Sequence, residues 1–292
     1  MPELPEVETV RIGLSAFLPG KTVKAAAHDW PKSFPNAPAD VKAFLIGAKI
    51  LRVKRRAKVL IIELNTKYSL VIHLKMTGQL VYRGEHERFG AGHPNDSLVH
   101  DLPDKTTHVQ LDFTDGSHLF FNDQRKFGWV RLLPTAEVSH LDFFVKVGPE
   151  PLAKDFTDTE FIQRLMRRKK SGIKAVLLDQ TVIAGIGNIY ADESLWGAKI
   201  HPETKVQDIP EKQLKTLFKE LQAVLWLAIE KGGSTDRNYV NAEGKKGSYM
   251  SFARVFRREG KPCPRCGTTI IKTRVAGRGT HICPHCQKQP AN

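Results

Sequence analysis

The residues best suited to chemistry stand at the start of the chain, in the sequence Met-Pro-Glu-Leu-Pro-Glu. Removal of Met1 would leave Pro2 with a secondary amine and a neighbouring carboxylate at Glu3. An α-amino group has a pKa of roughly 7.7–8.0, so much of it is unprotonated near neutral pH. Such an amine can attack an electrophilic carbon and form an iminium, with Glu3 as a proton donor or acceptor. Alternatively, Pro2 and Pro5 only shape the start of a helix, where proline is favoured.

A second group of reactive residues is formed by the four cysteines, which make two Cys-x-x-Cys pairs separated by positions 267–282. Four thiolates at this spacing suit a tetrahedral Zn²⁺ in a β-hairpin zinc ribbon. A closed four-sulfur site keeps no open position, so the metal is expected to be structural. Cysteines confined to one short stretch argue against a disulfide framework and for a reducing compartment. The predicted ligands are Cys263, Cys266, Cys283 and Cys286.

The segment between the two cysteine pairs is basic, with Lys272, Arg274 and Arg278 and no acidic residue. Arg278 stands between Gly277 and Gly279, and glycines allow another backbone to approach closely. A hairpin of this kind fits a DNA groove or backbone. The alternative is an ordinary arginine at a hairpin turn.

The composition narrows the classes of partner. The 292 residues are enough for two domains, and 45 Lys and Arg against 31 Asp and Glu give a net charge of +14. This charge indicates a polyanionic partner, most often nucleic acid, although a merely basic surface is the alternative. The longest dense apolar run, Ala223–Ile229, falls short of the ~20 residues of a membrane span, and the N-terminus lacks the pattern of a secretory signal. We therefore expect a cytoplasmic protein that does not contact membranes.

The first half of the chain must position the N-terminal residues. Apolar residues recur at helical spacing after Pro5 up to Leu18, and Pro19-Gly20 should end this helix. Residues 21–133 then show short, often alternating apolar segments with turn signals between them, which predicts a β-sandwich. The expected strands lie within Lys49–Leu64, Leu70–Leu74, Gln79–Tyr82, His108–Phe113, Ser117–Phe121 and Trp129–Leu133.

Three further segments of this half are interpreted as loops. Glu85–Asp104 is rich in Gly, His, Pro and Asp and is expected to be exposed. Lys54–Lys58 and Asp123–Gly128 are basic or mixed segments beside apolar strands, where they could contact phosphates. Taken alone, such basic runs are more often solvated surfaces.

The second half is predicted to be helical, after a linker at Gly148–Pro151. Thr157 and Glu160 have the spacing of a capping box. The turn at 184–188 could present N–H groups to a phosphate, although Gly-x-Gly alone is a weak signal. The expected elements are a helix ending in Arg167–Lys170, helices over Ile173–Asp179 and about Ile189–Trp196, a long helix from Pro210 to Gly232-Gly233, and a mobile loop over Ser234–Tyr249.

The N-terminal motif Pro2–Thr9, the four-cysteine ribbon and Gly187–Ala191 occur in an order that resembles the bacterial formamidopyrimidine-DNA glycosylases (8-oxoguanine DNA glycosylase/AP lyases) of the endonuclease VIII-like superfamily. The resemblance covers nearly the whole chain. It implies an α+β protein with an N-terminal β-sandwich and flanking helices, a helical helix–two-turn–helix domain and a zinc-ribbon finger, with DNA bound in the cleft between domains. The implied boundaries are 1–134 for the catalytic domain, 135–155 for the linker, 156–250 for the helical domain with its lesion-covering loop at 234–249, and 251–292 for the finger.

The resemblance also implies a set of catalytic residues. Pro2, once Met1 is removed, would form a Schiff base with the anomeric carbon of the damaged nucleotide. Glu3 would donate the proton for base loss, and Glu6 would support the site. Lys58 would be the proton donor in β-elimination and Arg278 in δ-elimination. The products would be a free oxidised purine and a strand with phosphates at both ends of the gap.

A damaged base inside a duplex must be flipped out before it can react, and another group must then fill the space that it leaves. The resemblance assigns this filling to Met76, Arg125 and Phe127, although core packing is the alternative for Met76 and Phe127. It further implies phosphate contacts by His73, Lys169, Lys174, Asn188 and Arg278. Tyr249 would belong to the loop that covers the flipped base.

Two positions and one four-residue segment depart from the family pattern. Thr106 stands where a DNA-contacting His is common, Lys126 where Arg is frequent, and Val255–Arg258 replaces a more usual Val-Tyr-Gly-Arg. Two other functions remain open: an endonuclease VIII-like enzyme for oxidised pyrimidines, disfavoured by Leu4, and a zinc-ribbon DNA-binding protein without catalysis. The leading expectation is a monomeric, nucleoid-associated bacterial enzyme that acts on damaged double-stranded DNA and holds one structural Zn²⁺.

Overall fold

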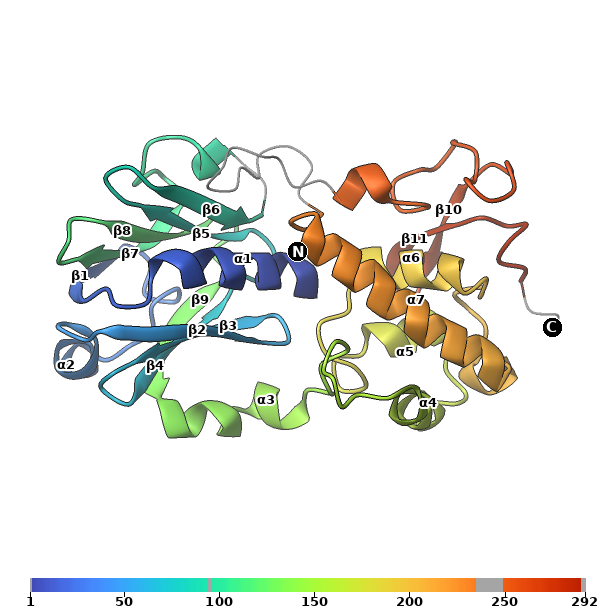
Figure 1. The fold of residues 1–292 in the computed structure, drawn as a ribbon, viewed down its shortest axis with the longest axis horizontal. Helices are drawn as coiled ribbons and strands as arrows, with labels where there is room; N and C mark the ends of the chain where they lie inside the picture. The colour runs from blue at the N-terminus through green and yellow to red at the C-terminus, as the bar shows by residue number, and fades with distance from the viewer. Residues whose placement is uncertain (1, 94–95, 235–248, 290–292) are drawn as a thin grey trace. The chain divides into compact units, whose positions relative to one another are not determined.

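The computed structural model describes residues 2–93, 96–234 and 249–289. The chain divides into two compact units, Met1–Val145 with Lys231–Ser248 and Lys146–Glu230 with Tyr249–Asn292, each with its own hydrophobic core (Figure 1). Apart from Ser234 and Tyr249, the expected mobile loop lies outside the described residues.

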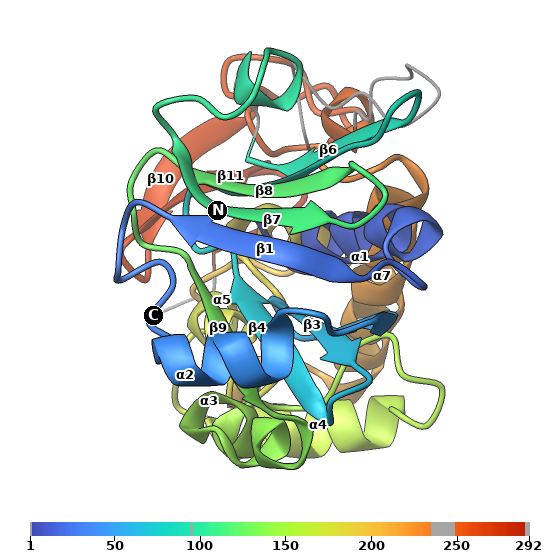
Figure 2. The same cartoon turned by 90° about the vertical axis from the view of Figure 1, so that its left-hand side faces the viewer.

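The first unit contains two antiparallel sheets that form the predicted β-sandwich (Figure 2). The five-stranded sheet has the order β1-β7-β8-β5-β6, with β1 at Val23–His28, β5 at Gly78–Arg83, β6 at Arg88–Gly92, β7 at Thr107–Phe113 and β8 at His118–Asp123. The four-stranded sheet has the order β2-β3-β4-β9, with β2 at Ile50–Arg56, β3 at Val59–Leu64, β4 at Tyr68–His73 and β9 at Trp129–Pro134.

Side-chain alternation explains why β3 is apolar along most of its length. Successive residues of a strand point to opposite faces. Leu60 and Ile62 therefore join the core between the sheets, whereas Val59 joins a cluster formed with the 3-10 helix η3 (Thr135–His140) and α3 (Asp142–Lys146). Both faces of β3 are thus covered. A short helical segment, α2 (Pro38–Asp40) followed by η1 (Val41–Leu45), adds Leu45 to the main core.

Helix α1 (Leu4–Phe17) follows the predicted pattern, with Val7, Val10 and Leu14 fully or almost fully buried in the sandwich core. It packs against β6 and β2, which are edge strands of the two sheets. Gly20 then takes a positive φ of 91°, which permits the chain to turn into β1. The N-terminal motif therefore lies on a helix that is fixed to both sheets.

Two of the expected loops are wrong in part. Glu85–Asp104 contains β6 and the 3-10 helix η2 (Asp96–Leu98), and its segment Phe89–Gly92 is buried. The small residues that suggested a loop are required by close packing, because a Cβ on Gly92 would lie 2.5 Å from the Gly78 carbonyl oxygen. Of the expected loop Lys54–Lys58, Lys54–Arg56 belongs to strand β2, and only Ala57 and Lys58 form the turn to β3.

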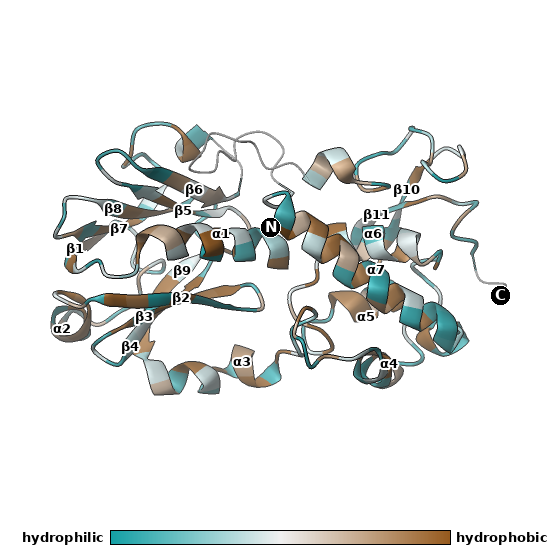
Figure 3. Cartoon of the chain, in the orientation of Figure 1, coloured by the Kyte–Doolittle hydropathy of each residue, from teal (hydrophilic) through white to brown (hydrophobic). Residues whose placement is uncertain are grey.

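The second unit is helical, with α4 at Asp158–Met166, α5 at Ile173–Leu178, α6 at Asn188–Gly197, the 3-10 helix η4 at Val206–Asp208 and α7 at Glu211–Glu230. One half of the predicted capping box of α4 is confirmed, since the Thr157 hydroxyl accepts a hydrogen bond from the Glu160 N–H at 3.2 Å, while the Glu160 carboxylate accepts from Arg164 at 2.9 Å. Helix α7 is amphipathic along its length, as its alternating colours in Figure 3 show, and it buries Leu217 and Leu221 in the core.

The chain ends in the predicted β-hairpin. The 3-10 helix η5 (Tyr249–Phe252) leads towards it, and β10 (Ile271–Val275) pairs antiparallel with β11 (Arg278–Ile282). Ala276 and Gly277 form the two-residue turn with positive φ values of 50° and 72°, the backbone that suits a tight hairpin. No helix in the described ranges is long and apolar enough to cross a membrane.

Candidate active site and zinc centre

The N-terminal motif is buried at the start of α1. Glu3 and Glu6 have only 4% and 5% of their surface exposed, and Pro2 is buried beside them. Glu6 connects two segments, because one carboxylate oxygen accepts from the Glu3 N–H at 2.8 Å and the other from the Ser234 N–H at 2.7 Å. Gly233 passes close to the same side chain, since a Cβ there would lie 3.1 Å from the Glu6 Cγ. Glu6 therefore ties the N-terminus to the segment that leads into the expected lesion-covering loop.

Lys58 lies in the β2–β3 turn and is 6% exposed. Arg55 holds this turn against α1. Its guanidinium donates to the Ala57 carbonyl oxygen at 2.8 Å and to the Glu8 carboxylate at 2.7 Å. Hydrogen bonds from Arg11 and Arg55 lower the pKa of Glu8 despite its burial, so this carboxylate stays charged. The turn with Lys58 and the helix with Pro2 and Glu3 are thus joined directly.

His73 ends strand β4 and is neutral at physiological pH. Burial, reinforced by the positive charges of Lys75 and Lys58, lowers its pKa to about 3. Its Nδ1 accepts a hydrogen bond from the Lys75 N–H at 3.0 Å, so in the neutral ring Nε2 carries the proton. His73 can therefore donate a hydrogen bond to a phosphate but brings no positive charge to it.

Met76, Arg125 and Phe127 stand on two loops that a buried carboxylate holds together. Asp123, which is fully buried, accepts from the Thr77 hydroxyl. It also accepts from the backbone N–H groups of Arg125, Phe127 and Gly128 at 3.2, 2.8 and 2.6 Å. The Phe127 ring remains 52% exposed, and the Arg125 guanidinium lies 4.8 Å from its centre. The structure thus presents an exposed aromatic side chain on a loop with a fixed backbone.

Sequence reasoning missed Asp123 and Thr77. Their only sequence signals were that Asp123 is the first residue of the mixed segment Asp123–Gly128 and that Thr77 follows Met76. Two residues of this unit that depart from the family pattern, Thr106 and Lys126, have partners close by. Thr106 donates its hydroxyl to Asp104 at 2.7 Å, and the Lys126 ammonium lies 4.8 Å from the centre of the Trp30 ring.

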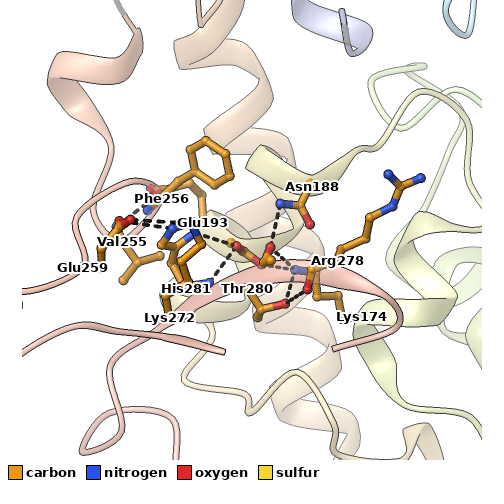
Figure 4. Close-up of polar contacts among 12 residues, drawn as sticks. Lys174, Asn188, Glu193, Val255, Phe256, Glu259, Lys272, Arg278, Thr280 and His281 are labelled. Carbon is orange, nitrogen blue, oxygen red and sulfur yellow. Dashed lines mark hydrogen bonds and ion pairs between the residues drawn. The ribbon is translucent and has the colours of Figure 1, made fainter. Parts of the chain in front are cut away.

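Lys169, Asn188 and Arg278 belong to the second unit, and Lys169 and Arg278 are exposed. Asn188 donates its side-chain N–H to the Gly279 carbonyl oxygen at 2.9 Å, next to Arg278. Figure 4 shows this contact and the side chain of Arg278, which extends away from it.

The expected phosphate contact of Lys174 does not fit the structure. Its side chain is fully buried, and its ammonium group lies 2.6 Å from both the Asp192 carboxylate and the Thr280 hydroxyl (Figure 4). A direct DNA contact of Tyr249 does not fit either, because this side chain is also fully buried and its hydroxyl donates to Glu193 at 3.3 Å.

Glu193, a third residue that sequence reasoning missed, anchors the segment before the finger. Its carboxylate accepts from the backbone N–H groups of Arg254, Val255 and Phe256 at 2.8–3.1 Å. Burial raises its pKa, although these hydrogen bonds act in the opposite direction. The backbone of the unusual Val255–Arg258 sequence is therefore anchored at Val255 and Phe256, and the Val255 side chain is fully buried.

The four cysteines meet at one point, with all four sulfur atoms within 4.8 Å of one another. The Sγ atoms of Cys263 and Cys286 are 4.0 Å apart and those of Cys266 and Cys283 are 3.4 Å apart. These distances fit a tetrahedral Zn²⁺, which requires about 3.8 Å between sulfurs for Zn–S bonds of ~2.3 Å. The site holds one structural zinc ion, as predicted.

Helix α6 contributes to the zinc centre through one aromatic residue. The Trp196 indole N–H points at the Cys263 sulfur at 3.4 Å. The guanidinium groups of Arg254 and Arg265 lie 5.2 and 3.9 Å from the centre of a Trp196 ring. Arg265 also donates to the carbonyl oxygens of Trp196 and Gly197 at 3.0 and 3.2 Å. The finger is thereby joined to the helical core of the same unit.

Comparison with known proteins assigns all three parts of the chain to one family. Family models match for the formamidopyrimidine-DNA glycosylase N-terminal domain at residues 1–130, for its H2TH domain at 147–239, and for the zinc finger found in FPG and IleRS at 260–289. The formamidopyrimidine-DNA glycosylase of Pelotomaculum thermopropionicum is 42% identical over 289 residues, 99% of each chain.

Solved structures show the same similarity. A Lactococcus lactis FPG mutant in complex with Fapy-dG-containing DNA has a TM-score of 0.86 and 36% identity, covering 99% of this chain and 100% of that one. A MutM structure in complex with carbocyclic 8-oxo-G-containing DNA has a TM-score of 0.84 and 36% identity at the same coverage. Because the similarity spans 99% of the chain at 42% identity, this protein belongs to the formamidopyrimidine-DNA glycosylase family.

Proposed function

We infer that this protein is a bifunctional DNA glycosylase and AP lyase of base excision repair, which removes oxidised purines such as 8-oxoguanine and formamidopyrimidines. The observation that carries this inference is the full-length match to formamidopyrimidine-DNA glycosylases by a chain with Pro2 and Glu3 in place. Its relatives were solved with Fapy-dG and carbocyclic 8-oxo-G in DNA. DNA is therefore the partner, and the charge of +14 favours its binding.

We assign the first chemical steps to the N-terminal motif. After removal of Met1, the Pro2 nitrogen attacks the anomeric carbon, and the bond from that carbon to the damaged base breaks. Glu3 supplies the proton that the departing base requires, and the sugar ring opens to give an iminium on Pro2. Glu6 supports this site, since its carboxylate holds the Glu3 backbone N–H.

The strand is then cleaved by two eliminations. In the first, loss of a C2′ proton from the iminium expels the 3′-phosphate, with Lys58 as the proton donor. In the second, loss of a C4′ proton from the now conjugated iminium expels the 5′-phosphate, with Arg278 as the proton donor. A gap with phosphates at both ends remains, and water releases the sugar fragment from Pro2.

We assign the space of the flipped base to Met76, Arg125 and Phe127. An exposed aromatic ring on a fixed loop, with a guanidinium above it, suits insertion between bases. The phosphate contacts are assigned to His73, Lys169, Asn188 and Arg278, of which Lys169 and Arg278 are exposed.

We further propose that the catalytic domain spans 1–134, the linker 135–155, the helical domain 156–250 and the finger 251–292. One lesion needs one catalytic N-terminus, so the enzyme is expected to act as a monomer. A chromosomal substrate places it at the nucleoid in the bacterial cytoplasm.

The decisive experiment is borohydride trapping on duplex DNA with a single 8-oxoguanine opposite cytosine, followed by mass spectrometry of the cross-linked peptide. Reduction fixes the iminium, so we expect a cross-link at an N-terminal Pro2. Pro2→Gly replaces the secondary amine of the ring with a primary amine and should trap far less. Lys58→Gln is the matched control, because it leaves the nucleophile intact.

A cross-link at a lysine, or none with DNA binding preserved, would overturn the assignment of Pro2. Trapping with oxidised pyrimidines but not with 8-oxoguanine would favour the endonuclease VIII-like alternative. DNA binding without trapping on an abasic site would favour a zinc-ribbon binding protein.

A further inference from the structure

We propose that the buried ion pair between Lys174 and Asp192 positions Arg278 for strand cleavage. Lys174 lies on α5 and Asp192 on α6 of the helical core. They form hydrogen bonds with each other and with residues 279–281 of β11. The proposal rests on the assignment of Arg278 to the second elimination. It replaces the expected phosphate contact of Lys174 with a role exerted through the protein.

The geometry that carries the proposal is a continuous chain of hydrogen bonds that ends at Arg278 itself. The Lys174 ammonium donates to Asp192 and to the Thr280 hydroxyl, both at 2.6 Å. The Thr280 hydroxyl in turn donates to the carbonyl oxygen of Arg278 at 3.0 Å. The side chains of Lys174, Asp192 and Thr280 are all fully buried.

The same pair also holds the next residues of β11. Asp192 accepts from the His281 backbone N–H at 2.9 Å, and the Lys174 ammonium lies 3.4 Å from the Gly279 carbonyl oxygen. Residues 279–281, which follow Arg278, are therefore each in contact with a side chain of the helical core. Figure 4 shows the contact between Lys174 and Thr280 and the Arg278 side chain extending away from it.

Stability alone does not explain a charged pair at this place. Two ions without solvent exposure lose their hydration, and apolar residues of similar volume often stabilise a protein equally well or better. An apolar pair, however, could neither donate to Thr280 nor accept from His281. What the ion pair adds is a set of directional hydrogen bonds. These bonds fix the position of β11 along and above the helices α5 and α6.

The position of the Arg278 backbone depends on these bonds, because Arg278 is the first residue of β11 and stands between two glycines. Gly277 has a φ of 72°, and neither it nor Gly279 carries a side chain that could pack against Arg278. A misplacement of about 1 Å can reduce a catalytic rate by about 100-fold. Because the backbone after Arg278 is held in place, the DNA has to select only the side-chain rotamer of Arg278.

The test replaces the pair with apolar residues, Lys174→Met with Asp192→Leu, so that no buried charge is left unpaired. The matched control is Lys215→Met with Glu211→Leu, an exposed ion pair of 2.8 Å on α7. Zinc content and circular dichroism establish that each variant is folded. The readout is the ratio of δ- to β-elimination products on DNA with a preformed abasic site.

We expect the apolar pair to lower this ratio at least tenfold while borohydride trapping at Pro2 is retained, and the control to leave it unchanged. Added to Arg278→Ala, the apolar pair should change the ratio less than twofold further, because both changes act through one side chain. Thr280→Val removes only the relay hydroxyl with little change in volume. It should lower the ratio by a factor of about two to five and gives a second test if the apolar pair fails to fold.

An unchanged ratio in folded apolar-pair and Thr280→Val variants would overturn the positioning role, provided that Arg278→Ala lowers it. A multiplicative effect of the apolar pair on Arg278→Ala would also overturn it, since the pair would then act elsewhere. If Arg278→Ala itself leaves the ratio unchanged, the role assigned to Arg278 fails and this proposal fails with it.

Discussion

Replacement of Asp123 by Asn is the substitution whose effect the structure predicts most directly. Asp123 is fully buried and accepts four hydrogen bonds. One carboxylate oxygen serves the Thr77 hydroxyl and the Arg125 N–H, and the other serves the N–H groups of Phe127 and Gly128. Asparagine has nearly the same shape but only one accepting oxygen. Its amide nitrogen would face two donors.

The magnitude follows from the two hydrogen bonds that lose their acceptor. Hydrogen bonds to a charged group contribute about 1.5–3 kcal/mol each, so the loss of two predicts about 3–6 kcal/mol. The loop from Gln124 to Phe127 is exposed and can move towards water, which favours the lower end of this range. We therefore expect Asp123→Asn to lower the free energy of unfolding of the first unit by about 3 kcal/mol.

The assay combines urea unfolding with hydrogen exchange at the amides of Phe127 and Gly128. Both amides should lose protection in Asp123→Asn before the sheet unfolds. Asp40→Asn, at an exposed position of the same unit, should change stability by less than about 0.5 kcal/mol. A loss below about 1 kcal/mol in Asp123→Asn, with both amides still protected, would refute the reasoning.

Three other predictions follow from the structure. The pKa of His73 is about 3 in the folded protein against about 6.5 when unfolded, so the unfolded chain binds the extra proton and stability falls as pH decreases from 6.5 towards 3. His73→Asn should remove a slope of up to about 1.4 kcal/mol per pH unit in that window, and equal slopes in both proteins would contradict this. Lys169→Ala should reduce the slope of log K against log salt for duplex DNA by about 0.9, and an unchanged slope would exclude its phosphate contact. Removal of zinc by a chelator, or Cys266→Ser, should unfold the finger and weaken DNA binding. Full affinity in zinc-free protein would show that the finger is dispensable.

The elements that sequence predicted well are those with a strong local period or spacing. The apolar spacing from Val7 to Leu14 specified the buried face of α1, and the paired Cys-x-x-Cys motifs specified the metal centre. Both signals are local, since the residues that cooperate lie within one helix or one short hairpin. The strand β6 was missed because its packing depends on glycine, which local composition associates with turns.

The errors in the candidate site have a different cause, which is long-range pairing. Lys174 reads as one more basic residue near Arg167–Lys170, but its hydroxyl partner, Thr280, lies 106 positions further along the chain. Tyr249 reads as part of a polar loop, but its partner is Glu193, 56 positions earlier. Nothing in the local pattern distinguishes such buried polar residues from exposed ones, because their partners are brought to them only by the fold.

The indole of Trp196 gives the zinc centre an optical reporter of its own. Its N–H points at the Cys263 sulfur, and Arg254 and Arg265 lie near its rings. A change in the charge on that sulfur, as when a thiol gives way to a metal-bound thiolate, alters the electric field at the ring. The emission of Trp196 can therefore follow metal uptake without an added dye. Trp226, 57% exposed on α7, would emit as a solvated reference in the same chain.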